Sequence, residues 1–372
     1  MAYAVIAWLA ARAPLRGCAS VGRSTRPVTV LKPLCGADAE TYESLRSFCD
    51  QAYPEYQIVF GVSDSHDPAV RLVERLQREF PQSDLQIAID RRQHGSSRKV
   101  SNLINMMPLA RHDMLVLSDG DVRVGRDYLR RIVAPLLDPS VGIVTCTYRG
   151  IPRAGFWSRL GALYVNDWFM PSVRVAAIAG SRSFAFGASI AIRREVLSSI
   201  GGFMAIANQL ADDYRLGELT RRIGLRTVLS DVVVETCVTE RSFAALVRHE
   251  LRWLRTIRTV RPVGYAFSFV TFGLPVAAFG ALLARGSQPA PGMLGVTVAA
   301  RILLHLMTRS ASSGASQLLI LPIRDTLSLG LWGWGFLTRR VHWRDEPYLV
   351  SRDGSARLAG GYERACTVAE DA

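Results

Sequence analysis

MLVLSDGDVR, residues Met114–Arg123, is the stretch that decides the fold of this chain. Its apolar start predicts a short buried strand, and two carboxylates, Asp119 and Asp121, follow it directly. Gly120 keeps the turn between them tight, and in an extended chain both acids would point to the same side. Because Mg²⁺ is usually held by one or two carboxylates together with substrate phosphates, the stretch predicts a metal and diphosphate site. An ordinary Asp/Gly turn after a strand is the alternative.

Strands and helices alternate on both sides of this stretch in the first part of the chain. The predicted strands are Val28–Leu31, Tyr56–Val62, Leu85–Ile89 and Leu115–Leu117. The predicted helices are Ala39–Cys49, Pro68–Phe80 and Lys99–Met107. This alternation predicts right-handed βαβ units and a parallel sheet. Ligands bind outside the carboxyl ends of such strands, which is where Asp64 and the Asp119/Asp121 pair fall.

The strict alternation ends after residue 140. We expect strands at Val141–Cys146, Phe184–Ile192 and Thr227–Val234, and helices at Trp157–Trp168, Glu195–Ile200 and Phe243–Val260. One more helix opens at Leu210–Tyr214 (LADDY) and runs to Arg222. Acids such as Asp212 and Asp213 at a helix start have an ordinary explanation, because capping and the helix dipole both favour them.

The composition restricts the partners. The chain has 372 residues, of which 49% are hydrophobic, a high share for a soluble protein. A net charge of +13 permits nucleic acid, anionic lipid or nucleotide-diphosphate partners. Zinc-finger spacing and basic residues interleaved with aromatics are both missing, so we expect no nucleic-acid partner. The six cysteines show no CxxC spacing, which is typical of reduced thiols in a cytosolic domain.

Three apolar segments follow Arg261: Pro262–Leu283, Met293–Met307 and Leu318–Leu337. The first has no charge and is long enough to span the ~30 Å of bilayer hydrocarbon. The second holds Arg301 and His305 and is a weaker candidate. The third holds Arg324-Asp325, which we expect either to pair with each other inside a bundle or to mark a re-entrant segment.

The arginines beside these segments predict their orientation. Arg339-Arg340, with Trp332, Trp334 and Trp343, is typical of an interfacial belt on the positive side of a membrane. If this belt and Arg258/Arg261 both face the cytoplasm, the number of crossings between them is even. We therefore expect one of the last two apolar segments not to cross.

The ordered motifs of the chain resemble a known family. They are Lys32-Pro33-Leu34-x-Gly36, Asp64 in VSDSHDPA, Asp119 in SDGD, Asp213 in ADDY, and Arg252-Trp253. Together they resemble the ceramide glucosyltransferase family, family 21 of the glycosyltransferases, which are membrane-attached relatives of the inverting family 2. The resemblance covers Val28–Val350, including Trp343-Arg344 and Tyr348. The runs Arg248–Ala266 (RHELRWLRTIRTVRPVGYA) and Phe186–Leu197 (FGASIAIRREVL) are most similar to bacterial hopanoid-biosynthesis glycosyltransferases.

The resemblance implies an α/β fold, with a GT-A type nucleotide-sugar-binding (Rossmann-like) domain followed by C-terminal membrane helices. It implies a donor site in which Asp64 binds the nucleotide and Lys99 and Asn102 make further contacts, with an ordinary solvated lysine as the alternative for Lys99. Asp119 would contact the donor and, with Asp121, hold Mg²⁺ or Mn²⁺ against the diphosphate. His249 stands where many relatives have Gln or Arg. It would either contact the donor pyrophosphate, as its counterparts do, or be an ordinary residue on the helix surface.

The resemblance also assigns the catalytic residues. Asp213, next to the tyrosine of its motif, would be the general base, with Asp212 as the alternative. Arg252 and Trp253 would close over the diphosphate and the acceptor, because a guanidinium matches phosphate oxygens and an indole stacks.

The implied reaction moves a sugar, N-acetylglucosamine, from a UDP-sugar to a lipid hydroxyl, that of bacteriohopanetetrol. The first alternative keeps the chemistry and changes the substrates. The protein would transfer glucose from UDP-glucose to ceramide, a sphingolipid, or would be a processive polysaccharide synthase. The second is a membrane-anchored regulator that binds nucleotides or polyanions. A transporter does not fit, because most of the chain predicts a soluble α/β domain.

These expectations divide the chain into four parts. Residues 1–27 form an apolar segment, which we expect to be the remnant of an anchor or a helix at the membrane interface. Residues 28–261 form the catalytic domain and 262–340 the membrane-associated helices. Residues 341–372 form a tail that we expect to be polar and loose from Ser351. We expect attachment to the bacterial inner membrane with the catalytic domain facing the cytoplasm.

Overall fold

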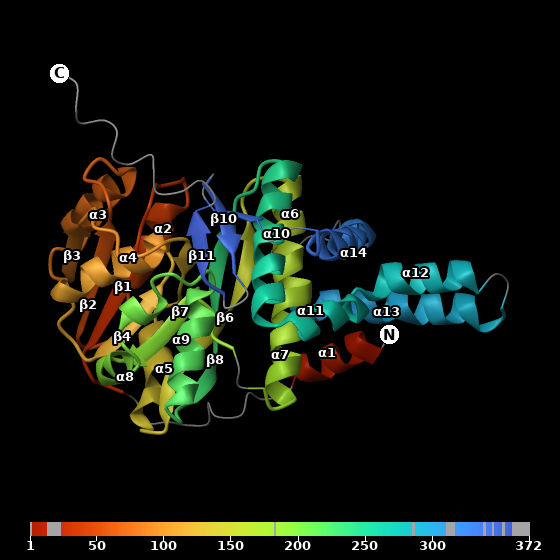
Figure 1. Ribbon diagram of the computed structural model, residues 1–372, viewed down its shortest axis with the longest axis horizontal. Coiled ribbons are helices and arrows are strands. Elements are labelled where there is room, and N and C mark those ends of the chain that lie inside the picture. Colours follow the sequence, from red (N-terminus) through yellow and green to blue (C-terminus); the bar gives the residue numbers. More distant parts are fainter. Residues whose placement is uncertain are drawn as a thin grey trace, which may run out of the picture.

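The computed structural model describes residues 2–12, 24–181, 184–284, 287–309, 317–337, 340–343, 346–351 and 354–358. Figure 1 shows a layered α/β body, from which the helices α12 and α13 project at one end. The interfacial-belt prediction falls partly on Arg339, which lies outside the described residues, as do Arg344 and residues 359–372.

Eight strands form the main sheet, in the order β3-β2-β1-β4-β7-β6-β8-β5. Their bounds are β1 Val28–Pro33, β2 Tyr56–Val62, β3 Asp84–Ile89, β4 Met114–Ser118, β5 Val122–Arg123, β6 Val141–Pro152, β7 Ser189–Arg193 and β8 Arg226–Val238. The first four strands in this order are parallel, which confirms the βαβ prediction. The sheet becomes mixed at β7, which runs antiparallel to both β4 and β6. Strand β7 is shorter than predicted, because Phe184–Ala188 leads into it without pairing.

Helices cover both faces of the sheet. They are α2 Thr41–Cys49, α3 Pro68–Glu79, α4 Arg98–Met106, α5 Tyr128–Val133, α8 Arg194–Ser199 and α9 Asp212–Arg222, with the short 3₁₀ turns η1 Met107–Leu109, η2 Ala134–Leu137 and η4 Phe203–Ile206. Alternate strand residues point to opposite faces, so Val30 joins one core, with α2, α3 and α5, while Leu31 joins the other, with α4, α8 and α9.

A third group of helices stands beside the sheet. It comprises α6 Phe156–Tyr164, the π-helical turn η3 Val165–Phe169, α7 Met170–Ile178 and α10 Phe243–Val260. Helix α10 has the predicted bounds and begins at Ser242, whose side chain accepts a hydrogen bond from the Ala245 amide (3.2 Å). The N-terminal helix α1, Ala2–Arg12, packs on α7, where the Tyr3 and Ser172 hydroxyls lie 2.6 Å apart.

The first apolar segment is bent, and its two parts are long and apolar enough to cross a membrane only when taken together. It divides into α11 Pro262–Phe267, the 3₁₀ turn η5 Ser268–Thr271 and α12 Gly273–Leu283, with a bend of 68°. The weaker candidate, Met293–Met307, lies within α13 Pro289–Thr308, the one described helix that is by itself long and apolar enough to cross a membrane. The length and hydropathy of the segment do not predict the bend, which falls between Thr271 and Gly273.

The expectation that Arg324 and Asp325 pair with each other is wrong. Both lie in α14, Gln317–Trp334, and both are buried. Arg324 pairs with Glu250 of α10, and Asp325 pairs with Arg301 of α13. Side chains of adjacent helical residues diverge by about 100°, so each reaches a different neighbouring helix.

The C-terminal tail is not loose where the structure describes it. Strands β9 Arg340–Trp343, β10 Glu346–Val350 and β11 Ala356–Leu358 form a second sheet. This sheet docks beside the start of α9, because Leu210 N donates to Gly354 O (3.1 Å) and Ala356 N donates to Asn208 O (2.9 Å). Tyr348 of β10 packs against Leu210. The division of the chain into four parts stays a prediction.

Candidate active site

All the predicted site residues line one cleft at the carboxyl ends of the parallel strands. They are Asp64, Lys99, Asn102, Asp119, Asp121, Asp213, His249, Arg252 and Trp253. Asp64 follows strand β2, and Asp119 and Asp121 follow strand β4. Helix α4 carries Lys99 and Asn102, α9 carries Asp213, and α10 carries His249, Arg252 and Trp253. The structure thus brings these residues together, while their individual roles stay predictions.

Lys99 is the centre of charge in the cleft. Its Nζ lies 2.5 Å from Asp119 Oδ1. A Cβ built on Gly187 would stand 3.2 Å from both Lys99 Nζ and Asp213 Oδ2, so these two side chains converge over that glycine. Burial lowers the pKa of Lys99, but the carboxylates of Asp119, Asp212 and Asp213 outweigh it and raise the pKa above its ordinary value. Lys99 therefore links the predicted metal ligand to the predicted base.

Asp119 and Asp121 do not lie in the extended chain that the sequence led us to expect. Strand β4 ends at Ser118, and the two acids flank the turn before β5. Asp121 Oδ2 accepts a hydrogen bond from the Thr236 hydroxyl of β8 (2.6 Å). The acids are therefore positioned by a turn and a neighbouring strand, and not by strand alternation.

The donor set of the cleft fits a hard divalent cation. The described residues contain no group of three or more His, Cys, Asp and Glu side chains arranged to hold a metal. Two carboxylate groups, Asp119 and Asp121, match what Mg²⁺ takes from a protein when substrate phosphates and water complete its shell. These two residues would hold the ion.

Lys32 does not line the cleft but contacts the acidic turn from the protein interior, in a role that the sequence did not reveal. It is fully buried beneath the acidic turn, and its Nζ donates hydrogen bonds to the Asp119 carbonyl and to Ser118 Oγ. It also lies over the Phe48 ring, 3.9 Å from the centroid. Burial lowers the pKa of Lys32 to about 7. The motif around Lys32 was visible in the sequence, but its contact with a residue 87 positions away was not.

Asp213 is held by backbone amides at the start of α9. Its Oδ2 accepts a hydrogen bond from Gly187 N and its Oδ1 one from Tyr214 N, both 2.7 Å. Asp212 Oδ1 accepts from Asp213 N (2.9 Å). Burial, followed by the charge of Asp212, raises the pKa of Asp213 to about 6. A carboxylate with such a pKa is suited to accept a proton near neutral pH.

Helix α10 supplies one aromatic and basic wall of the cleft. The His249 ring lies 4.3 Å from the Trp253 ring, and His249 Nδ1 pairs with Glu240. Trp253 in turn stacks on Tyr164 of α6, at 5.9 Å between centroids. Burial lowers the pKa of Arg252, and the charge of Asp119 opposes that shift. His249 therefore lies in the cleft, as a residue in contact with Trp253.

Asp64 and Asn102 also line the cleft. The Asp64 side chain is half-buried, accepts a hydrogen bond from His66 N (2.9 Å) and pairs with Arg91 (3.0 Å). The hydrogen bonds from His66, and then that from Arg91, lower the pKa of Asp64 to about 2. Asn102 Nδ2 donates to Gly61 O (2.7 Å), while Asn102 Oδ1 has no hydrogen-bond partner among the described residues. Asn102 thus braces the end of β2 and keeps one acceptor atom unused.

Comparison with known proteins identifies the family. The family model of Glycosyl transferase family 21 matches residues 1–356. Ceramide glucosyltransferase 3 of Caenorhabditis elegans is 22% identical over 231 residues, which are 61% of this chain and 50% of that protein. Ceramide glucosyltransferase of Komagataella phaffii is 32% identical over 113 residues, which are 29% of this chain and 22% of that protein. The chain thus spans half or less of the length of these curated relatives.

A solved structure shows the fold. The mannosyltransferase PcManGT from Pyrobaculum calidifontis, in complex with GDP-Man and Mn²⁺, superposes with a TM-score of 0.54 at 22% identity, covering 88% of this chain and 94% of that one. The sheet order and the position of the cleft agree with a GT-A type glycosyltransferase. The chain therefore belongs to glycosyl transferase family 21.

Proposed function

We propose that this protein transfers N-acetylglucosamine from a UDP-sugar to a lipid hydroxyl, with inversion at the anomeric carbon. The observation that carries the proposal is the position of Asp213. Its carboxylate converges with Lys99 over Gly187, in the same cleft as Asp119, and the pKa of Asp213 is raised to about 6. Membership of Glycosyl transferase family 21 supports sugar transfer.

In this mechanism Asp213 takes the proton of the acceptor hydroxyl while that oxygen attacks the anomeric carbon. The bond between the sugar and the UDP oxygen breaks on the opposite face. Lys99 and Arg252 bring positive charge to the diphosphate, and Trp253 gives the acceptor an apolar wall. Mg²⁺ or Mn²⁺ bound at Asp119 and Asp121 would neutralise the charge on the departing UDP.

The acceptor in this proposal is bacteriohopanetetrol, a hopanoid. The runs Arg248–Ala266 and Phe186–Leu197 support this branch of the family. Transfer of glucose to ceramide is the second candidate, favoured by the names of the curated relatives. Offering both donors and both lipids to the same membranes, with the product identified by mass spectrometry, decides between the two.

A membrane brings the lipid to the cleft. Large apolar side chains are more than half exposed on α11, η5, α12 and α13, including Val263, Phe267, Phe279, Leu282 and Met293. Exposed apolar surface of this extent indicates an interaction with lipid or protein. We propose attachment to the bacterial inner membrane with the cleft facing the cytoplasm, consistent with the arginines beside these helices.

The substitution Asp213→Asn separates this enzyme from a regulator that only binds nucleotides. An enzyme with Asp213 as its base loses turnover and keeps UDP binding, measured by calorimetry. A binding protein has no turnover to lose, so absence of transfer by the unmodified protein with every donor and lipid pair would contradict the proposal.

A further inference from the structure

An ion pair joins the helix that lines the cleft to an apolar helix of the C-terminal segment. Arg324 of α14 binds Glu250 of α10 through two parallel hydrogen bonds, Nη1 to Oε1 (2.6 Å) and Nη2 to Oε2 (2.8 Å). Glu250 is 2% exposed and Arg324 is 1% exposed. Arg324 also donates to Ser328 Oγ and to the Leu160 carbonyl of α6. The guanidinium is thus fixed from three helices.

Glu250 lies on the face of α10 that points away from the cleft. Residues two apart in an α-helix point about 200° apart, so Glu250 and Arg252 face nearly opposite directions. Arg252, Trp253 and His249 line the cleft, whereas Val247, Leu251 and Leu254 form a buried cluster with Leu331 of α14, against which Trp253 also packs. Any rotation of α10 that displaces Glu250 therefore moves Arg252 by the same angle.

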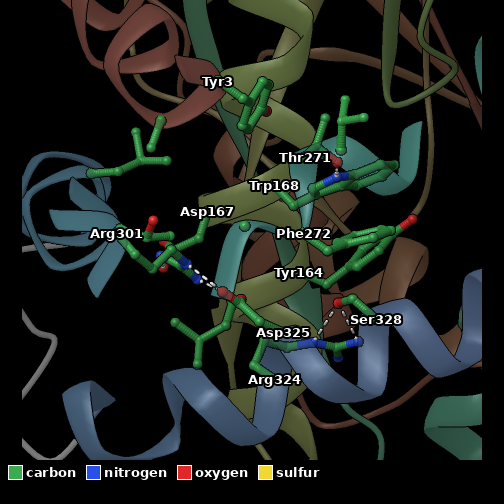
Figure 2. Close-up of a pocket in the computed structure, with 16 residues that line it drawn as sticks. Tyr3, Tyr164, Asp167, Trp168, Thr271, Phe272, Arg301, Arg324, Asp325 and Ser328 are labelled. Atoms are coloured by element: carbon green, nitrogen blue, oxygen red, sulfur yellow. Dashed lines mark hydrogen bonds and ion pairs between the residues drawn. The ribbon is translucent and has the colours of Figure 1, made fainter. Parts of the chain in front are cut away.

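The partner helix α14 is itself anchored by a second group of charges. Asp325 accepts hydrogen bonds from Arg301 of α13 (2.9 and 3.1 Å), and Arg301 also donates to Asp167 of η3 (3.0 Å). Figure 2 shows Arg324 directed at Ser328, and Arg301 and Asp325 directed at each other. Asp167 also accepts from Thr308 (2.7 Å). Helix α14 is therefore bound at two separate points, through Asp325 to α13 and through Arg324 to α10.

We propose that Glu250 and Arg324 are positioning residues that set the rotation of α10 and thereby hold Arg252 at the donor diphosphate and Trp253 beside the acceptor. The inference rests on the proposed function for the identity of the ligand. A hydrophobic pair of similar volume would pack in the same place, since buried ion pairs are often replaceable without loss of stability. What such a pair lacks is the directional, two-point bond that fixes helix rotation.

The experiment compares three forms of the full chain in detergent or in liposomes. The positioning variant is the double substitution Glu250→Gln with Arg324→Met, which removes both charges and leaves no buried ion unpaired. The exchange Glu250→Arg with Arg324→Glu restores a pair of opposite polarity. The control is Asp325→Asn, which weakens the neighbouring pair of the same helix without touching α10. Melting temperature, UDP affinity by calorimetry, and kcat and KM for the donor are measured for each.

We expect the double variant to melt near the unmodified protein, to bind UDP about tenfold more weakly, and to lose on the order of 10²-fold in kcat, because small misplacements of catalytic groups cost that much. The exchange variant should recover part of both losses, and Asp325→Asn should keep its UDP affinity. Unchanged UDP affinity and kcat in a folded double variant would overturn the proposal. So would an equal loss in Asp325→Asn, since that would indicate general destabilisation. Failure of the unmodified protein to bind UDP would instead overturn the proposed function.

Discussion

Lys99 Nζ and Asp119 Oδ1 lie 2.5 Å apart at the floor of the cleft, and Lys32 donates to the backbone carbonyl of the same aspartate from beneath. Lys32 and Lys99 are the two lysines among the 45 basic Lys and Arg residues of the chain. Both lysines of the chain thus contact the same residue, Asp119. A lysine is a compact point charge on a flexible stem, whereas an arginine requires room for a planar fork.

Replacing Lys99 by Met should change the pH dependence of transfer. Lys99 favours the ionised form of Asp213, so its removal raises the pKa of that carboxyl further above about 6. Because the base acts when it is deprotonated, the acidic limb of kcat/KM should move to higher pH. The matched control, Lys99→Arg, keeps the charge and should keep the limb near its original position. An acidic limb at the same pH in Lys99→Met would show that Asp213 does not sense this lysine.

Lys32 should be intolerant even of Arg. Its side chain is fully buried, and a guanidinium does not fit without displacing Phe48 or the acidic turn. Lys32→Met leaves the Asp119 carbonyl without this donor, at a cost of about 1–3 kcal/mol in unfolding free energy. We expect weaker UDP binding in both variants, measured by calorimetry. UDP binding at full strength in a folded Lys32→Met protein would show that the turn needs no such support.

Asp213→Asn should slow transfer by about 10²–10⁴-fold, the usual contribution of a general base. In the unmodified protein, activity should fall as the pH drops through about 6, where Asp213 becomes protonated. Asp212→Asn is the matched control, because it tests the alternative base. A larger loss in the Asp212 variant would exchange the two assignments.

The Asp213 carboxylate should destabilise the folded protein at neutral pH. Its pKa is higher in the folded than in the unfolded protein, so the stability it contributes is present below the unfolded value and is lost as the pH rises through about 6. Asp213→Asn should therefore raise the melting temperature at about pH 8 more than at about pH 4. An equal effect at both pH values would contradict the raised pKa.

Gly187→Ala tests how tightly the site is built. The added Cβ would stand 3.2 Å from Asp213 Oδ2 and from Lys99 Nζ, closer than ordinary contact, so the charged pair must separate. We expect reduced kcat in a protein that still folds. Gly280→Ala in α12, where nothing lies within 4 Å of the added atom, is the matched control. Equal activity of the two variants would argue against a converging Lys99 and Asp213.

The residues of the cleft could be predicted from the sequence better than the packing contacts that hold them in position. Asp64 and Asp119 could be placed at one edge because chain order and strand alternation determine which ends of a parallel sheet meet, whereas Asp213, at a helix start, was assigned from the resemblance to the family motif. The mixed half of the sheet, the 68° bend before Gly273 and the turn geometry of Asp121 arise from packing between distant segments. Arg324 and Glu250 are separated by 74 residues, and nothing in the local pattern of either helix indicates the other.

Transfer assayed in membranes that contain the protein tests the central claim most directly. UDP-N-acetylglucosamine or UDP-glucose is offered with bacteriohopanetetrol or ceramide, with and without a chelator, and the products are identified by mass spectrometry. We predict a hopanoid that carries N-acetylglucosamine, lost on chelation and in Asp213→Asn. Glucosylceramide as the product would contradict the proposed donor and acceptor but would be consistent with the proposed mechanism. Absence of transfer to any of these lipids would contradict the proposal that the protein transfers a sugar to a lipid.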